Sequence, residues 1–166
     1  AMIRVGNQKG LHNFKELRRI TFSIFLLGAV FASFFAIIFF IFHKSLPNIY
    51  VDLNDITNYE DNKEVIFIAS KLLLVAAFFQ ISDSIQVIIL GALRGLQDVK
   101  IPTIITFISY WIVGFPISYF LGKEEAYGSF GIWMGLLAGL TTASILLFIR
   151  FNSLTLKLIK QKHELT

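Results

Sequence analysis

The chain has 166 residues, of which 55% are hydrophobic and only 16% are charged. Charges this sparse, set between long apolar blocks, exclude an ordinary soluble domain and predict an integral membrane protein. The sequence has no cysteine, which excludes disulfide scaffolds, thiolate metal sites and thiol nucleophiles. The net charge of +4 does not indicate a nucleic-acid partner, because the basic residues cluster at the ends of the apolar blocks.

Polar and apolar blocks alternate along the chain and predict four transmembrane helices. The chain begins with a basic segment in which Asn13 and Glu16 are placed to cap the start of a helix. The predicted segments, in chain order, are a loop and helix lead-in (1–19), a transmembrane helix (20–42), an acidic loop (43–63), a transmembrane helix (64–93), a short loop (94–101), a transmembrane helix (102–121), a second short loop (122–128), a transmembrane helix (129–149) and a basic tail (150–166).

Asp83 is the residue on which the functional interpretation depends. It lies in the run Leu72–Leu93, which contains no other ionisable group and would form a helix about 33 Å long, close to the roughly 30 Å core of a bilayer. An acid at that depth normally faces a bundle interior or a wet cavity and marks an ion or substrate path. The alternative is an acid buried for packing alone, although Ser, Thr, Asn and Gln are the commoner polar contacts between spans.

The neighbours of Asp83 favour the functional alternative. Gln80, Asp83 and Gln86 share one face of the predicted helix, and Ser84 flanks Gln80. Their carboxylate, amide and hydroxyl oxygens are the ligands that hard cations such as Na⁺ prefer. The opposite side, which includes Leu74, is apolar and can face lipid or other helices. This pattern predicts a site that lines a pathway.

The third and fourth spans carry helix-shaping residues. Pro116 removes a backbone hydrogen bond in mid-span, so we expect a kink near Gly114. That kink could act as a bending point or simply shape a groove. In the fourth span Gly131, Gly135 and Gly139 form a ridge that permits close helix packing. The tail after it has enough apolar residues to lie along the membrane.

Basic residues are distributed unequally between the two sets of loops. One set, in 1–19, 94–101 and the tail, holds most of the basic residues of the loops. The other set, in 43–63 and 122–128, holds only Lys44, Lys63 and Lys123. The positive-inside rule therefore predicts that both ends of the chain are cytoplasmic. The acidic loop 43–63 and the loop 122–128 are then extracytoplasmic. No H-E-x-x-H, G-x-S-x-G or paired carboxylates occur in the spans, so we do not expect an enzyme.

Ordered motifs across the spans resemble one known family. The chain is similar to the carboxy-terminal part of multidrug and toxic compound extrusion (MATE) transporters of the NorM branch, over nearly its whole length. The motifs that carry the resemblance are IRVGNQKG (3–10), FQISDSIQ (79–86), GALRGLQD (91–98), YWIVGFPISY (110–119), GIWMGLLAGL (131–140) and RF (150–151).

The resemblance implies an all-α membrane protein whose four helices are the last four of twelve and form part of the second six-helix lobe. It implies a cation-coupled antiporter of the bacterial inner membrane, which exports cationic amphipathic drugs or dyes in exchange for Na⁺ or H⁺ and needs no cofactor. Asp83 matches the carboxylate that contributes to cation binding in this lobe, where it would be a Na⁺ ligand, with Gln80, Ser84 and Gln86 as supporting wall residues. The amino-terminal helices of the same protein would be the partner, because the family's other coupling acids lie there.

Two other functions stay open at this point. A flippase for lipid-linked sugars has a similar helical plan, but we would expect several basic groups in its cavity, whereas the run around Asp83 holds only an acid. A membrane subunit that does not transport but packs against a partner would tolerate the loss of Asp83. Membrane lipid is a partner in every case.

Overall fold

The computed structural model describes residues 1–51, 59–123 and 127–164 of the chain. Its elements are α1 (Met2–Gly10), α2 (Phe14–Phe42), the 3₁₀ turn η1 (Pro47–Ile49), α3 (Tyr59–Gly95), α4 (Lys100–Ile108), the π-helical stretch η3 (Ser109–Gly114), α5 (Phe115–Leu121) and α6 (Gly128–Glu164). Within these described residues, four helical segments are long and apolar enough to cross a membrane: Phe14–Phe42, Tyr59–Gly95, Lys100–Leu121 and Gly128–Lys162. The predicted all-α membrane fold with four spanning helices is confirmed.

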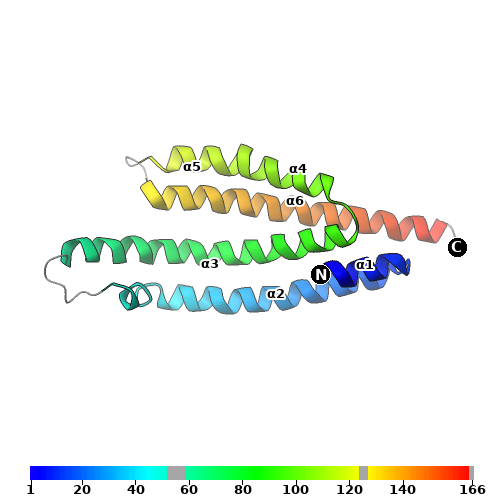
Figure 1. Ribbon diagram of the computed structural model, residues 1–166, viewed down its shortest axis with the longest axis horizontal. Helices are drawn as coiled ribbons and strands as arrows, with labels where there is room; N and C mark the ends of the chain where they lie inside the picture. The colour runs from blue at the N-terminus through cyan, green and yellow to red at the C-terminus, as the bar shows by residue number, and fades with distance from the viewer. Residues whose placement is uncertain (52–58, 124–126, 165–166) are drawn as a thin grey trace.

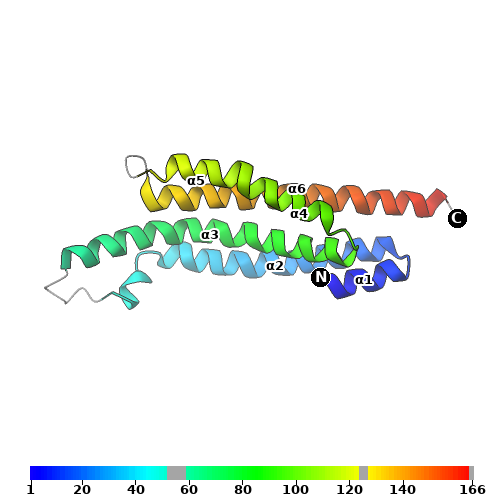
Figure 2. The same ribbon diagram turned by 45° about the horizontal axis from the view of Figure 1, so that its top comes forward.

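The long helices lie side by side in the order α2, α3, α6 and α4–α5 (Figures 1 and 2). α3 packs against α2 on one side and α6 on the other, while α6 also packs against η3 and α5. The short α1 lies beside α2 and the last turns of α3. α3 is therefore the inner helix of the row, with neighbours on two sides.

A cluster of buried apolar side chains holds α1, α2, α3 and α6 together at the end of the bundle where α3 finishes. Its members are Val5, Phe14, Leu17, Ile89, Ala92, Leu93, Leu96, Leu147 and Phe151. Polar contacts surround this cluster: Lys9 Nζ donates to the Leu96 carbonyl at 2.8 Å, and Arg150 Nε lies 2.9 Å from Asp98 Oδ2. Lys9 thereby places a positive charge on a free carbonyl at the end of α3.

The first part of the chain corrects one prediction. Residues 1–19 were expected to be a loop and helix lead-in, but Met2–Gly10 forms α1. Asn13 then caps α2 as expected, with its side chain accepting a hydrogen bond from the Glu16 amide at 3.3 Å. α1 forms because Val5 is fully buried in the apolar cluster. Gly95 permits the contact, since a Cβ there would lie 2.6 Å from the Met2 carbonyl oxygen.

The acidic loop is shorter than predicted. Of the range 43–63, Tyr59 onwards already belongs to α3, whereas Asp52 and Asp55 fall outside the described residues. Glu60 and Asp61 occupy the first turn of α3. Carboxylates are favourable there because the helix dipole is positive at its N-terminus. The polar residues that indicated a loop therefore extend the helix beyond its apolar run.

The tail corrects a second prediction. The range 150–166 was expected to be a separate tail along the membrane, but α6 continues without a break to Glu164. Phe151 and Thr155 are fully buried, and Leu154, Leu158 and Ile159 pack against the apolar cluster. Those apolar residues therefore contact the other helices of the chain, and this packing keeps the segment helical after its hydropathy has fallen.

The third span contains an irregular turn. Ser109–Gly114 is π-helical and leads directly into Phe115 and Pro116, which is in the first turn of α5. Proline lacks an amide proton and its ring crowds the preceding turn, so a wider π turn before it relieves a strain that a regular α-helix would carry. A bend of the helix axis at Gly114 and Pro116 stays a prediction.

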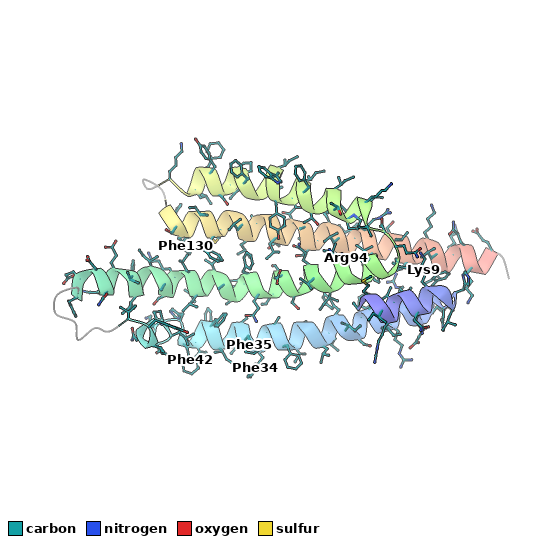
Figure 3. All side chains as sticks on the ribbon, viewed as in Figure 1. Lys9, Phe34, Phe35, Phe42, Arg94 and Phe130 are labelled. Atoms are coloured by element: carbon teal, nitrogen blue, oxygen red, sulfur yellow. The ribbon has the colours of Figure 1, made fainter. Side chains whose placement is uncertain are left out.

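The glycine ridge of α6 faces the third span. A Cβ at Gly131 would overlap the Leu121 carbonyl, one at Gly135 would overlap the Ser118 backbone, and one at Gly139 would lie 3.0 Å from the Gly114 Cα. The ridge therefore brings the backbones of α6, α5 and η3 into direct contact, as small residues do between membrane helices. Bulky side chains lie elsewhere: Phe34 and Phe42 are exposed on the side of α2 away from α3 (Figure 3).

We predict that Gly135→Ala weakens the packing of α5 on α6. The added methyl group would collide with the Ser118 backbone, and overpacking of this kind costs about 1–3 kcal/mol. Unfolding in mixed micelles, followed by circular dichroism, measures the loss. Gly10→Ala is the matched control, because nothing lies within 4 Å of a Cβ there; equal stability of the two variants would contradict the role of the ridge.

Candidate functional site

Asp83 projects from α3 on a side that neither α2 nor α6 covers. Its side chain is exposed, and among the described residues no group donates a hydrogen bond to it or pairs with it. Because the surrounding run Leu72–Leu93 is apolar, this is a carboxylate at bilayer depth, where water or another part of a protein must meet it.

Gln86, one helical turn from Asp83, is held by the third span. Its side chain is 9% exposed, and its Oε1 accepts a hydrogen bond of 3.2 Å from the Tyr110 hydroxyl. The Asp83 carboxylate is close enough to the Tyr110 phenol for the two to interact electrostatically. Tyr110 belongs to η3, so the irregular turn of the third span supplies the hydroxyl that binds Gln86, one helical turn along α3 from Asp83.

Ser84 lies against α2, and Gln80 is partly buried nearby on α3. A Cβ added to Gly28 of α2 would lie 3.1 Å from Ser84 Oγ, so Ser84 lies in the contact between α2 and α3. Gln80 Oε1 is buried and has no hydrogen-bond partner among the described residues. The structure thus groups Asp83 with Gln86 and Tyr110, while Ser84 belongs to a helix contact.

The remaining polar side chains of this region join α3 to α6. Ser82 Oγ lies 3.1 Å from Thr141 Oγ1, and Ser144 Oγ donates to the Ser82 carbonyl at 2.9 Å. These bonds give the hydroxyl groups the hydrogen-bond partners that lipid tails cannot provide. They also fix the rotation of α3, so that Asp83 keeps its direction.

The arrangement can supply part of a cation site. A carboxylate, an amide and a phenol provide oxygen ligands suited to a hard cation or a proton. In the part of the chain that the structure describes, no three Asp, Glu or His residues group together to hold a metal ion. A complete shell around a cation at Asp83 therefore needs further oxygen atoms from water, backbone or other chain segments.

Tyr110 is the functional candidate that sequence reasoning missed. The sequence places it at the start of the motif 110–119 but gives it no role, because its partner Gln86 is 24 residues away. Its position just before Gly114 and Pro116 was the available signal, since π turns in helices are frequent at functional sites.

The MatE family model matches residues 1–120 of the chain. The chain belongs to the MatE family. The resemblance to MATE transporters read from the motifs is confirmed, and the relatives below extend it to proteins named NorM and MdtK. Which part of a longer MatE protein the chain represents stays a prediction.

The relatives are similar over most of this chain. Multidrug resistance protein MdtK of Proteus mirabilis is 38% identical over 154 residues, which cover 90% of this chain and 32% of MdtK. Multidrug resistance protein NorM of Aliivibrio fischeri is 38% identical over 152 residues, 89% of this chain and 31% of NorM. A probable NorM of Bacillus licheniformis is 33% identical over 150 residues, 90% and 31% of the two chains. The chain spans about a third of the length of these relatives.

We predict that Tyr110 and Gln86 stabilise the bundle as a pair. Tyr110→Phe leaves the buried Gln86 oxygen without its donor, which costs about 1–3 kcal/mol. A double-mutant cycle of Tyr110→Phe with Gln86→Met, measured by unfolding in mixed micelles, should give a coupling energy of about 1 kcal/mol. Tyr119→Phe, at an exposed tyrosine of α5, is the control; strictly additive effects in the cycle would rule the bond out.

Proposed function

We infer that this chain is part of a cation-coupled multidrug efflux antiporter, which exports cationic amphipathic compounds in exchange for Na⁺ or H⁺. One observation carries the proposal: a carboxylate at bilayer depth, Asp83, lies open on the inner helix of the bundle without a counter-charge among the described residues. Membership of the MatE family and the names of the relatives support the same conclusion.

The mechanism follows from the cost of that charge. An ionised carboxylate at bilayer depth is unfavourable until a cation or a proton neutralises it. If one access state exposes Asp83 to water and the other encloses it, a bound cation stabilises the two states unequally. Such a difference in affinity is what shifts a conformational equilibrium. Drug and cation would then occupy the cavity in alternation, which gives exchange.

Gln86 and Tyr110 would position the cation site. Their hydrogen bond links α3 to η3. Binding or release of a cation at Asp83 would therefore be transmitted through this bond to the turn that precedes Pro116. Gln80 would offer its unpartnered oxygen from the other side of Asp83. We propose Gly114 and Pro116 as the point where the third span bends as the access state changes, because a π turn needs less rearrangement than a regular helix.

We also propose the orientation in the membrane. α1, the end of α3 and the carboxy-terminal part of α6 gather at one end of the bundle (Figures 1 and 2). Lys9 and Arg94 lie at this end (Figure 3), together with Arg18 and Arg150. The positive-inside rule makes it the cytoplasmic end, in a bacterial inner membrane.

The decisive experiment is Asp83→Asn in the complete transporter. We expect efflux of a cationic dye driven by a Na⁺ or proton gradient to fall to background, because a neutral amide can neither take up a proton nor supply the negative charge that binds Na⁺. Uptake of the dye into everted vesicles measures export, because their cytoplasmic face is outside. Each gradient is imposed separately to identify the coupling ion, and immunoblotting checks membrane insertion.

Asp61→Asn is the matched control, since Asp61 is an exposed carboxylate in the first turn of the same helix; its efflux should equal wild type. Gradient-driven efflux at the wild-type rate in Asp83→Asn would remove Asp83 from the mechanism. Loss in both variants would point to a general defect and would leave no special role for Asp83.

A further inference from the structure

A second feature lies between α3 and α6, near the starts of both helices. It is a groove of about 1040 Å³. Most of its lining is apolar and includes Leu74, Val75, Phe78, Met134 and Leu137. Phe130, at the beginning of α6 (Figure 3), and Tyr127 also line it.

The groove is on the side of α3 opposite the candidate cation site. Leu74 precedes Asp83 by nine residues, so the two side chains point about 180° apart on an α-helix. The face with Asp83 needs water or protein, whereas the face with Leu74 is compatible with lipid. The groove therefore opens on the side of the bundle that can meet the bilayer directly.

Two side chains of opposite charge belong to the lining of the groove. Lys71 and Glu64 both line it, and both are exposed. Lys71 Nζ lies 4.1 Å from the centre of the Phe67 ring, so the side chain reaches back towards the start of α3, as lysines near a membrane interface do. Glu64 is one further turn along, about 4.5 Å beyond Phe67.

We propose that this groove binds a phospholipid whose headgroup carries both a phosphate and a primary amine, as phosphatidylethanolamine does. Lys71 binds the phosphate, Glu64 accepts hydrogen bonds from the ammonium group, and one acyl chain occupies the apolar wall from Leu74 to Phe78. Lys71 lies further along α3 towards the middle of the span than Glu64 does. In a phospholipid the phosphate is likewise nearer the hydrocarbon than the terminal amine is, so the two charges of the protein follow the same order as those of the headgroup. The site is independent of cation coupling at Asp83.

The test uses the full-length transporter in nanodiscs of equal phosphatidylethanolamine and phosphatidylglycerol, followed by native mass spectrometry of the lipid retained after detergent extraction. Wild type should retain phosphatidylethanolamine in preference. Lys71→Met should lower that retention about tenfold, as expected for the loss of a charge-assisted contact. Glu64→Gln should remove the preference over phosphatidylglycerol, which lacks the amine.

Lys44→Met is the matched control, because Lys44 is an exposed lysine just after α2 and outside the groove; it should retain lipid as wild type does. Lys71→Arg, which keeps the charge, should also retain it and shows that the position tolerates substitution. Equal retention in Lys71→Met and Lys44→Met, or no preference in wild type, would overturn the proposal.

A photo-crosslinker identifies the occupant directly. Benzoylphenylalanine in place of Phe78 should yield a phosphatidylethanolamine adduct that Lys71→Met diminishes. The same group in place of Phe34, on the outer side of α2, should give lipid adducts that Lys71→Met leaves unchanged, because it meets bulk lipid. A peptide adduct at Phe78 would mean that protein fills the groove, and it would overturn the proposal, as would the absence of a lipid adduct.

Discussion

The structure depends on one constraint: inside a bilayer, each polar group must find its partner within the protein. Most hydroxyls of the spans do so locally, as when Thr21 donates to the Leu17 carbonyl and Ser109 to the Ile105 carbonyl. Between helices, Ser82 Oγ pairs with Thr141 Oγ1 and Ser144 Oγ donates to the Ser82 carbonyl. Two groups of α3 depart from this rule among the described residues: Gln80 Oε1 is buried without a partner, and no described residue pairs with Asp83, which is the more costly of the two to leave unpaired.

The glycine ridge of α6 makes the candidate site geometrically possible. Because Gly135 and Gly139 bring the third span against α6, and α6 also packs on α3, Tyr110 can reach Gln86 across the bundle. A wider spacing would separate the phenol from the amide. The packing of the third span on α6 and the hydrogen bond between Tyr110 and Gln86 therefore depend on each other, and a substitution that disturbs one should weaken the other.

The features that depend on neighbours in the chain could be predicted from the sequence, whereas those that depend on contacts between distant residues could not. Hydropathy located the four spans, and depth alone singled out Asp83, because both depend on a residue and its neighbours in the chain. The helical state of Met2–Gly10 and of the segment after Arg150 was missed, since it comes from the burial of Val5 and Phe151 against distant residues. Tyr110 was missed for the same reason, as its role depends on Gln86.

The two faces of α3 that α2 and α6 leave open differ in polarity. Asp83 is on one face and the groove beside Leu74 on the other, so a rotation of α3 that exposed the carboxylate to lipid would also bring apolar groove residues towards water. Both changes are unfavourable. The contacts of Ser82 with α6 and of Ser84 with Gly28 of α2 oppose such a rotation as well. This packing therefore opposes rotation of α3 on its own, and under the proposed mechanism α3 would move as a rigid body with its neighbours while the third span bends at the irregular turn Ser109–Gly114.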